Sequence, residues 1–107
     1  MNRVFKALSD PTRRQVLLLL RERPMSAGEL SDHFAVSKPT MSAHFSVLQE
    51  AELIVAEKSG RMIFYRLKMS VLEDALLGFV QSMGWKDARR TAALGRNRAK
   101  RRGLKEA

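Results

Sequence analysis

Short polar and small side chains share one face of a helix predicted at residues 37–51, SKPTMSAHFSVLQEA. At about 3.6 residues per turn, Met41, Phe45 and Leu48 recur at i, i+4 and i+7, which predicts a buried stripe. The face away from that stripe carries Lys38, Pro39, Thr40, Ser42, Ala43 and Ser46. Such short side chains let a backbone approach another surface closely, and a DNA major groove is wide enough to admit a helix. Taken alone, the pattern fits a DNA-reading helix and, equally well, a solvent-exposed helix that happens to be rich in Ser and Ala.

The chemistry of this face is hydrogen bonding and methyl contact. Phosphate contacts supply affinity without sequence information, whereas contacts to base edges supply specificity. Ala43 is suited to a thymine methyl, and Ser and Thr hydroxyls are permissive readers of bases. His44 lies closer to the buried stripe, so a structural or backbone-contacting role and a base contact both stay open for it. The DNA-binding set predicted for this helix is Ser37, Lys38, Thr40, Ser42, Ala43, His44 and Ser46.

The sequence offers no set of residues for catalysis or for a conventional metal site. No Ser/His/Asp set, paired carboxylates in a cleft or Gly-rich phosphate loop can be assembled, so we expect no enzyme. Cysteine is absent, which excludes disulfides, thiolate metal sites and thiol-based redox sensing. His33 and His44 are the only histidines, and we expect no metal and no cofactor.

The basic charge of the chain is concentrated near its C-terminus. The 107 residues carry a net charge of +9. Residues 86–107 hold nine Lys and Arg against two acidic residues, whereas residues 1–85 hold eleven against nine, so most of the excess lies in this last segment. We predict a DNA-binding and dimerisation domain at residues 1–84 and a basic, flexible tail at 85–107. No signal peptide and no span-length apolar run is apparent, so a cytoplasmic protein is expected.

Three shorter helices are predicted before the DNA-reading helix. Residues 2–8 form the first, and Ser9 or Asp10 caps a second, largely buried one that runs from Pro11 to about Arg23. Residues 26–29, SAGE, match a capping box that opens a third helix ending near Phe34, with Leu30 and Phe34 facing inward. A turn at residues 35–36 then leads to Ser37, which caps the DNA-reading helix. The third and fourth helices together predict a helix-turn-helix.

A β-hairpin is predicted directly behind the helix-turn-helix. Residues 53–57 and 61–67 are rich in β-branched and aromatic residues, and residues 58–60, KSG, supply the turn. A hairpin in this place is a wing, and we expect Lys58 and Arg61 to touch phosphates or the minor groove. A role in closing the core is compatible with this, and we assign it to Ile63, Tyr65 and Leu67.

The last predicted helix covers residues 71–83, with Ser70 as its cap and Glu73 and Asp74 in its first turn. Its broad apolar face favours pairing with a second subunit over packing against its own domain. The fold class is therefore mostly α with a β-hairpin (α+β), a homodimeric winged helix-turn-helix. The dimerisation residues predicted in this helix are Leu72, Leu76, Phe79, Val80 and Met83.

Three motifs occur in order along residues 1–84. They are FKALSDPTRR at residues 5–14, SAHF at 42–45 followed by Leu48, and Gly60-Arg61 leading into FYRL at 64–67. Together they resemble the ArsR/SmtB family of winged-helix repressors, and within it a branch of autorepressors. The resemblance implies a homodimer that represses transcription by covering operator DNA. It also implies that the first and last helices form the interface, which adds Val4, Phe5 and Leu8 to the predicted dimerisation residues. Arg13 and Arg14 are taken as surface charges or helix-packing groups despite their place in the motif.

The departures from the family concern its sensing sites. Metal sensors of this family carry Cys-x-Cys on the helix before the recognition helix, where this chain has ELSDHF at residues 29–34. Other members bind zinc through His and carboxylates on paired terminal helices, but residues 71–83 contain no histidine. Phe45 stands where Leu is common, and Glu52 stands where Gly often follows Ala51, which leaves the end of the helix open.

These patterns predict a sequence-specific transcriptional repressor that binds double-stranded operator DNA as a homodimer, without a metal or thiol sensing site. One alternative is a non-specific, architectural nucleic-acid-binding protein driven by the basic tail. A second is an effector-responsive sensor with an unrecognised ligand site. By analogy with the family, we expect DNA binding to be regulated by the abundance of the protein or by a partner protein that sequesters it.

Overall fold

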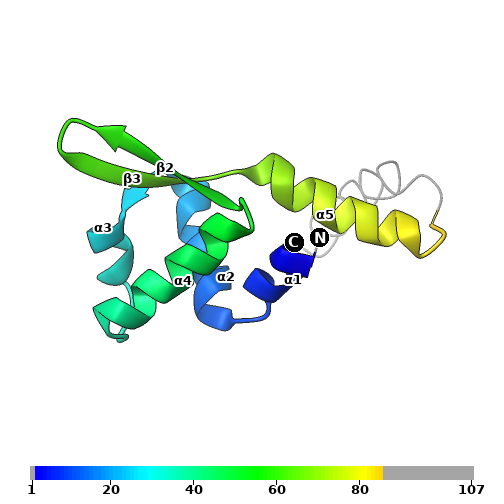
Figure 1. Cartoon of the computed structure of the whole chain (residues 1–107), viewed down its shortest axis with the longest axis horizontal. Coiled ribbons are helices and arrows are strands. Elements are labelled where there is room, and N and C mark those ends of the chain that lie inside the picture. The colour runs from blue at the N-terminus through cyan, green and yellow to red at the C-terminus, as the bar shows by residue number, and fades with distance from the viewer. Residues whose placement is uncertain (1, 86–107) are drawn as a thin grey trace, which may run out of the picture. The chain divides into compact units, whose positions relative to one another are not determined.

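Five helices and a small sheet make up residues 2–85, the part of the chain that the computed structural model describes (Figure 1). The chain divides into two units, the first ending at Leu72 and the second beginning at Glu73. The elements follow one another as α1 (Asn2–Leu8), α2 (Pro11–Glu22), β1 (Met25–Ser26), α3 (Ala27–Ser31), α4 (Lys38–Glu50), β2 (Ile54–Ser59), β3 (Met62–Leu67) and α5 (Met69–Ser82). The predicted α+β winged helix-turn-helix is confirmed.

Helix α2 is the central helix of the first unit, as predicted. Asp10 is its N-cap and accepts a hydrogen bond from the backbone N–H of Arg13, and Pro11 occupies the first turn, where its missing N–H costs nothing. Val16, Leu17 and Leu20 are buried. The helix ends at Glu22 because Arg23, next to Pro24, is already extended.

Helix α3 is shorter than predicted. The capping box is present, since Ser26 accepts from the N–H of Glu29 and the Glu29 carboxylate accepts from the N–H of Ser26. The helix ends at Ser31 rather than near Phe34. After Ser31 the N–H groups of His33 and Phe34 bond to carbonyls three residues back, so the chain tightens into turns, and Phe34 is only half-buried.

The three-stranded antiparallel sheet has the order β1-β3-β2. The short strand β1, which the sequence did not predict, pairs Met25 with Tyr65 and Ser26 with Phe64. The hairpin pairs run from Ile54 with Leu67 to Ser59 with Met62. In Figure 1 the tip of this hairpin and the first turns of α4 lie at the same end of the picture.

The hairpin turn lies later in the sequence than predicted. Strand β2 extends through Ser59, so Gly60 and Arg61 form a two-residue turn in place of residues 58–60. Gly60 has φ +61° and Arg61 is not in the left-handed region, the arrangement of a type II′ turn with Gly at its first central position. Tyr65 and Leu67 are partly buried, but the prediction that Ile63 closes the core is wrong, because its side chain is 53% exposed. Ile63 shares their face but lies opposite Lys58, near the tip and beyond the reach of the core.

Helix α5 begins at Met69, before the predicted start. Strand β3 ends at Leu67, and the carbonyl of Lys68 accepts the N–H of Val71, so Lys68 rather than Ser70 stands in the capping position. The first turn therefore contains no acidic residue, contrary to the prediction for Glu73 and Asp74. Within residues 2–85 no helix is long and apolar enough to cross a membrane. All but the first residue of the basic tail predicted at 85–107 lies outside the described residues, and the boundary after residue 84 stays a prediction.

Candidate nucleic-acid interface

Helix α4 starts at a polar cap, as the sequence predicted. Ser37 is extended (φ −62°, ψ 151°), and its hydroxyl oxygen accepts the N–H of Thr40 at 3.4 Å. The same hydroxyl donates to Thr40 Oγ1 at 2.9 Å. Both side chains are exposed. Ser37 and Thr40 thus hold each other at the start of the helix, with oxygen lone pairs open to the solvent.

The end of α4 is a Schellman motif built around a glutamate. The N–H of Glu52 bonds to the carbonyl of Gln49 at 2.9 Å, and the N–H of Leu53 bonds to that of Leu48 at 3.1 Å. Leu48 and Leu53 are both fully buried, the apolar contact typical of this motif. Glu52 takes the left-handed position with φ +60°, where Gly is usual. The helix end that the sequence left open is therefore at Glu50, with Ala51 as its cap.

The two faces of α4 differ as predicted in burial. Met41, Phe45 and Leu48 are buried. The ring centroids of Phe45 and Tyr65 are 5.1 Å apart, and the two ring planes meet at 37°. On the opposite face every predicted position except His44 is exposed within the chain: Ser37, Lys38, Thr40, Ser42, Ala43 and Ser46. The helix is thus anchored to the core by one side, and the other side presents hydroxyls, one ammonium group and the methyls of Thr40 and Ala43.

His44 is the exception, because its side chain is only 15% exposed. Its Nδ1 atom lies 3.2 Å from Nη1 of Arg13, and its Nε2 atom lies 3.9 Å from Oδ2 of Asp10. A guanidinium can only donate, so Nδ1 must accept and the proton of a neutral ring sits on Nε2. These contacts support the structural role among the two that the sequence left open for His44.

Asp10 carries a negative charge beside this histidine. The backbone N–H of Arg13 holds the pKa of Asp10 below its ordinary value of 3.8, with further lowering by the neighbouring His44, by the backbone N–H of Thr12 and by the Arg13 guanidinium. Asp10 is therefore ionised at neutral pH, which suits its place at the positive N-terminal end of α2.

Arg13 is the residue whose contacts the sequence did not indicate. Its Nε donates to the carbonyl of Ala7 at 2.8 Å and its Nη2 to that of Lys6 at 2.9 Å, so it caps the end of α1. Arg14 donates to the carbonyl of Leu8 at 2.8 Å in the same way. Both arginines are helix-packing groups, one of the two roles left open for them. No local signal could have revealed the contact to His44, which is separated from Arg13 by 31 positions.

The tip of the wing places both predicted basic residues on the surface. Lys58 and Arg61 are exposed and form no ion pair with another residue among 2–85. Farther along the hairpin, Glu57 and Arg66 pair across the strands at 2.7 Å and neutralise each other. The charge left over on the hairpin is therefore at its tip.

The predicted dimerisation residues differ in what they expose. Val4 is only 5% exposed and has little surface left for a partner, whereas Phe5 and Leu8 on α1 are half-buried. On α5, Leu76, Phe79 and Met83 are exposed, and Leu72 and Val80 are half-buried.

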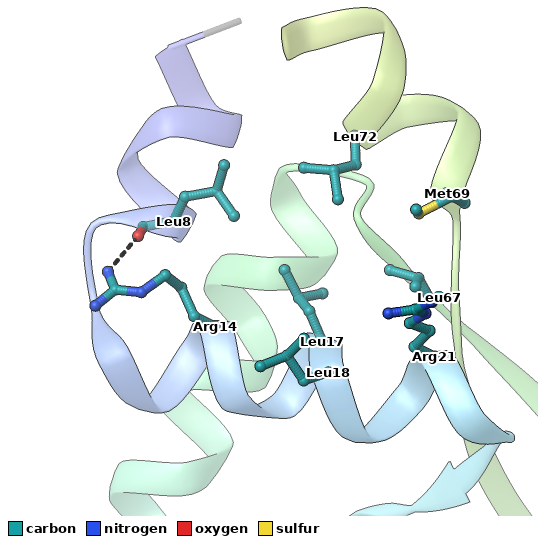
Figure 2. Close-up of a pocket in the computed structure, with 8 residues that line it drawn as sticks. All are labelled: Leu8, Arg14, Leu17, Leu18, Arg21, Leu67, Met69 and Leu72. Carbon is teal, nitrogen blue, oxygen red and sulfur yellow. Dashed lines mark hydrogen bonds between the residues drawn. The ribbon is translucent and has the colours of Figure 1, made fainter. Parts of the chain in front are cut away.

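Leu8 and Leu72 belong to the wall of an apolar groove of about 300 Å³ in the first unit. In Figure 2, Leu8, Leu17 and Leu72 point toward the same space, and Arg14 and Arg21 stand on its rim. Leu18, also in the wall, is 57% exposed.

Within residues 2–85 no three His, Cys, Asp or Glu side chains lie close enough to hold a metal ion. His33 is exposed, and His44 faces Arg13 and Asp10.

Comparison with known proteins gives the family of the chain. A model of a helix-turn-helix domain matches residues 8–56. The transcriptional repressor SdpR of Bacillus subtilis is 47% identical over 76 residues, which cover 71% of this chain and 84% of SdpR. An ArsR-like transcriptional regulator from Rhodococcus has a similar structure, with a TM-score of 0.71 and 33% identity over 89% of both chains. A homodimeric winged helix-turn-helix DNA-binding domain from Mycobacterium bovis has a TM-score of 0.61 at 27% identity, over 78% of this chain and 76% of that one. The chain belongs to the ArsR/SmtB family of DNA-binding helix-turn-helix transcriptional regulators, which are not enzymes.

Proposed function

We propose that the chain is a sequence-specific repressor that binds operator DNA as a homodimer, with α4 in the major groove and the wing tip on the flanking backbone. The observation that carries this proposal is the exposed outer face of α4, where short side chains stand above a fully buried stripe. A solvated helix face would be expected to carry long charged side chains instead. The similarity to SdpR, a transcriptional repressor, and to the homodimeric DNA-binding domain from Mycobacterium supports the same function.

In this proposal the two parts of the interface have different tasks. Thr40, Ser42, Ala43 and Ser46 approach base edges, where hydroxyls can donate or accept and the Ala43 methyl can meet a thymine methyl. Lys38, Lys58 and Arg61 provide cations for phosphates, and they are available because they form no ion pair with another residue of the described part. Phosphate contacts alone would bind every sequence alike, so preference for an operator depends on α4.

A second copy of the chain is the proposed partner of α1 and α5. Leu8 and Leu72 line the groove of Figure 2, and Leu76 and Met83 add exposed apolar surface on α5. Burying apolar area of this kind contributes roughly 25 cal/mol per Å². Two copies would also match an operator with two half-sites, the usual arrangement for helix-turn-helix dimers.

We further propose that DNA release does not depend on a metal or a thiol. The whole sequence contains no cysteine, so a Cys-based sensor cannot be built from it. The two histidines have different surroundings: His33 is exposed to solvent, and His44 is hydrogen-bonded to Arg13. Control by cellular abundance or by a sequestering partner protein in the cytoplasm fits this chemistry, and adding zinc, copper or nickel should leave DNA affinity unchanged.

The test compares the DNA upstream of the protein's own coding sequence with random DNA of equal length. Ser42→Ala should reduce the preference for the specific site by about threefold to tenfold, since one ordinary hydrogen bond is worth about 0.5–1.5 kcal/mol. Gln49→Ala, an exposed position of α4 outside the proposed set, is the matched control and should keep that preference. Equal binding of wild-type protein to every DNA tested, including sequences selected from a random pool, would contradict the proposal.

Deleting residues 86–107 separates the repressor from the architectural alternative. These residues carry nine of the 20 basic side chains. For a repressor, the deletion should mainly flatten the salt dependence of binding, because fewer counterions are released, while site preference survives. For a protein driven by its tail, the deletion should abolish binding altogether.

A further inference from the structure

We propose that Arg13 is a positioning residue for DNA binding, because its guanidinium joins the end of α1 to His44 and so fixes the orientation of α4. The inference rests on the proposed function, in which α4 reads DNA and α1 contacts the second subunit. It adds a residue outside the DNA-facing surface that sets how the reading helix is presented.

The geometry gives each nitrogen of the guanidinium its own acceptor. Nε and Nη2 donate to the carbonyls of Ala7 and Lys6, at 2.8 and 2.9 Å, and Nη1 donates to His44 Nδ1 at 3.2 Å. The last carbonyls of a helix have no partner within the helix, and a cation is favoured at that end. One rigid planar group therefore meets the C-terminal turn of α1 and the middle of α4 at the same time.

This arrangement also fixes the state of the His44 ring. Since Arg13 donates to Nδ1, the neutral ring carries its proton on Nε2, directed toward the Asp10 carboxylate 3.9 Å away. Three of the four proposed base-reading positions, Ser42, Ala43 and Ser46, lie within two residues of His44 along α4. A ring free to turn would lose the hydrogen bond through which Arg13 connects this part of α4 to the last carbonyls of α1.

Lysine cannot replace arginine here, although it keeps the charge. An ammonium group is a single donor atom on a flexible stem, whereas the three bonds of Arg13 use a planar fork. Arg13→Lys therefore removes the link while leaving net charge and salt dependence nearly the same. Arg23→Lys is the matched control, because Arg23 also bonds through its guanidinium, to Glu29, at the other end of α2.

Two variants of His44 separate its acceptor from its ring. In His44→Asn the amide oxygen stands one bond beyond Cγ, as Nδ1 does, so it can still accept from Arg13. His44→Leu fills similar space but accepts nothing. We expect His44→Asn to keep specific-site affinity within about threefold, and His44→Leu to lose about tenfold, as for one hydrogen bond to a charged group.

A double-mutant cycle on specific-site affinity gives the decisive comparison. In the wild-type background His44→Leu should cost about tenfold, and in the Arg13→Lys background less than about twofold, because the link is already lost. Equal costs in both backgrounds, or failure of His44→Asn to retain affinity, would overturn the inference, since His44 would then act on DNA directly. If Arg13→Lys does not fold, the comparison of His44→Leu with His44→Asn still decides. If the wild-type protein shows no preference for the specific site, the proposed function is overturned instead, and with it this inference.

The Nδ1 nitrogen of His44 provides a readout that does not depend on DNA. Nitrogen NMR of protein labelled at histidine, recorded on the neutral rings, should show the Nδ1 signal of His44 displaced by the hydrogen bond from Arg13, and exposed His33 serves as the internal reference. In Arg13→Lys the Nδ1 signal of His44 should move toward that of His33. An Nδ1 signal of His44 that does not move in that variant would contradict the role assigned to Arg13.

Discussion

Glu52→Gly should make the protein more stable, although it removes a whole side chain. Glu52 has φ +60° at the end of α4, and its side chain is exposed. An L-residue in the left-handed region costs about 1–2 kcal/mol, whereas Gly occupies it freely. Gly also increases the conformational entropy of the unfolded chain, and this offsets about 0.4–1 kcal/mol of the stabilisation gained by relieving the strain. The net gain in unfolding free energy is therefore about 0.5–1 kcal/mol.

The charge of Glu52 must be separated from its backbone conformation. Its carboxylate lies at the negative end of the α4 dipole, so removing it contributes about 0.3 kcal/mol by itself. Glu52→Ala removes the charge but keeps the Cβ atom, and it is the control. The gain of Gly over Ala therefore measures the backbone strain less the unfolded-chain entropy of Gly.

Thermal unfolding followed by circular dichroism at equal protomer concentration measures these differences. For a domain of this size, about 1 kcal/mol corresponds to about 4–8 °C, so Glu52→Gly should raise the Tm by about 3–6 °C. Concentration must be matched because association shifts the apparent stability. If Glu52→Gly proves no more stable than Glu52→Ala, the left-handed strain at this helix end is refuted.

Two further predictions concern the capping box and the wing. Hydrogen bonding from Arg23, and then from the backbone of Ser26, lowers the pKa of Glu29. The stabilisation by the carboxylate is therefore fully present above its ordinary pKa of 4.5 and is lost as the pH falls through the lowered value. Urea unfolding should find wild type more stable than Glu29→Gln near neutral pH, with the difference shrinking below pH 4.5; a difference that persists in acid would argue against this ion pair. Gly60→Ala places a Cβ in open space but at φ +61°, so it should lower the unfolding free energy by about 1 kcal/mol through backbone strain alone. No loss of stability in that variant would contradict the turn geometry.

Features set by neighbouring residues were predictable from the sequence. The caps at Asp10, Ser26 and Ser37 were correct, because each depends on a side chain and an N–H two or three residues away. The buried stripe of α4 was also correct, because helical periodicity is a local property. The predicted turn of the wing was wrong by about one residue, since Gly60 tolerates more than one turn position.

Features set by distant parts of the chain were not predictable. Alternation along β3 placed Ile63 on the face of Tyr65, but it could not tell how far the core extends under the hairpin. The contact between Arg13 and His44 joins residues that no spacing rule connects. Helix α5 started earlier than predicted, directly after Lys68, whose N–H bonds to the distant carbonyl of Leu53 and whose own carbonyl accepts the N–H of Val71.

The central claim is that the outer face of α4 meets a DNA duplex. Because the chain has no cysteine, Ser42→Cys creates a single thiol that can carry a photo-activated cross-linker. We expect this probe to attach to bases in the major groove of the specific site, and to attach much less to random DNA under the same conditions. Cross-linking to the second subunit instead, or equal cross-linking to every DNA, would contradict the account.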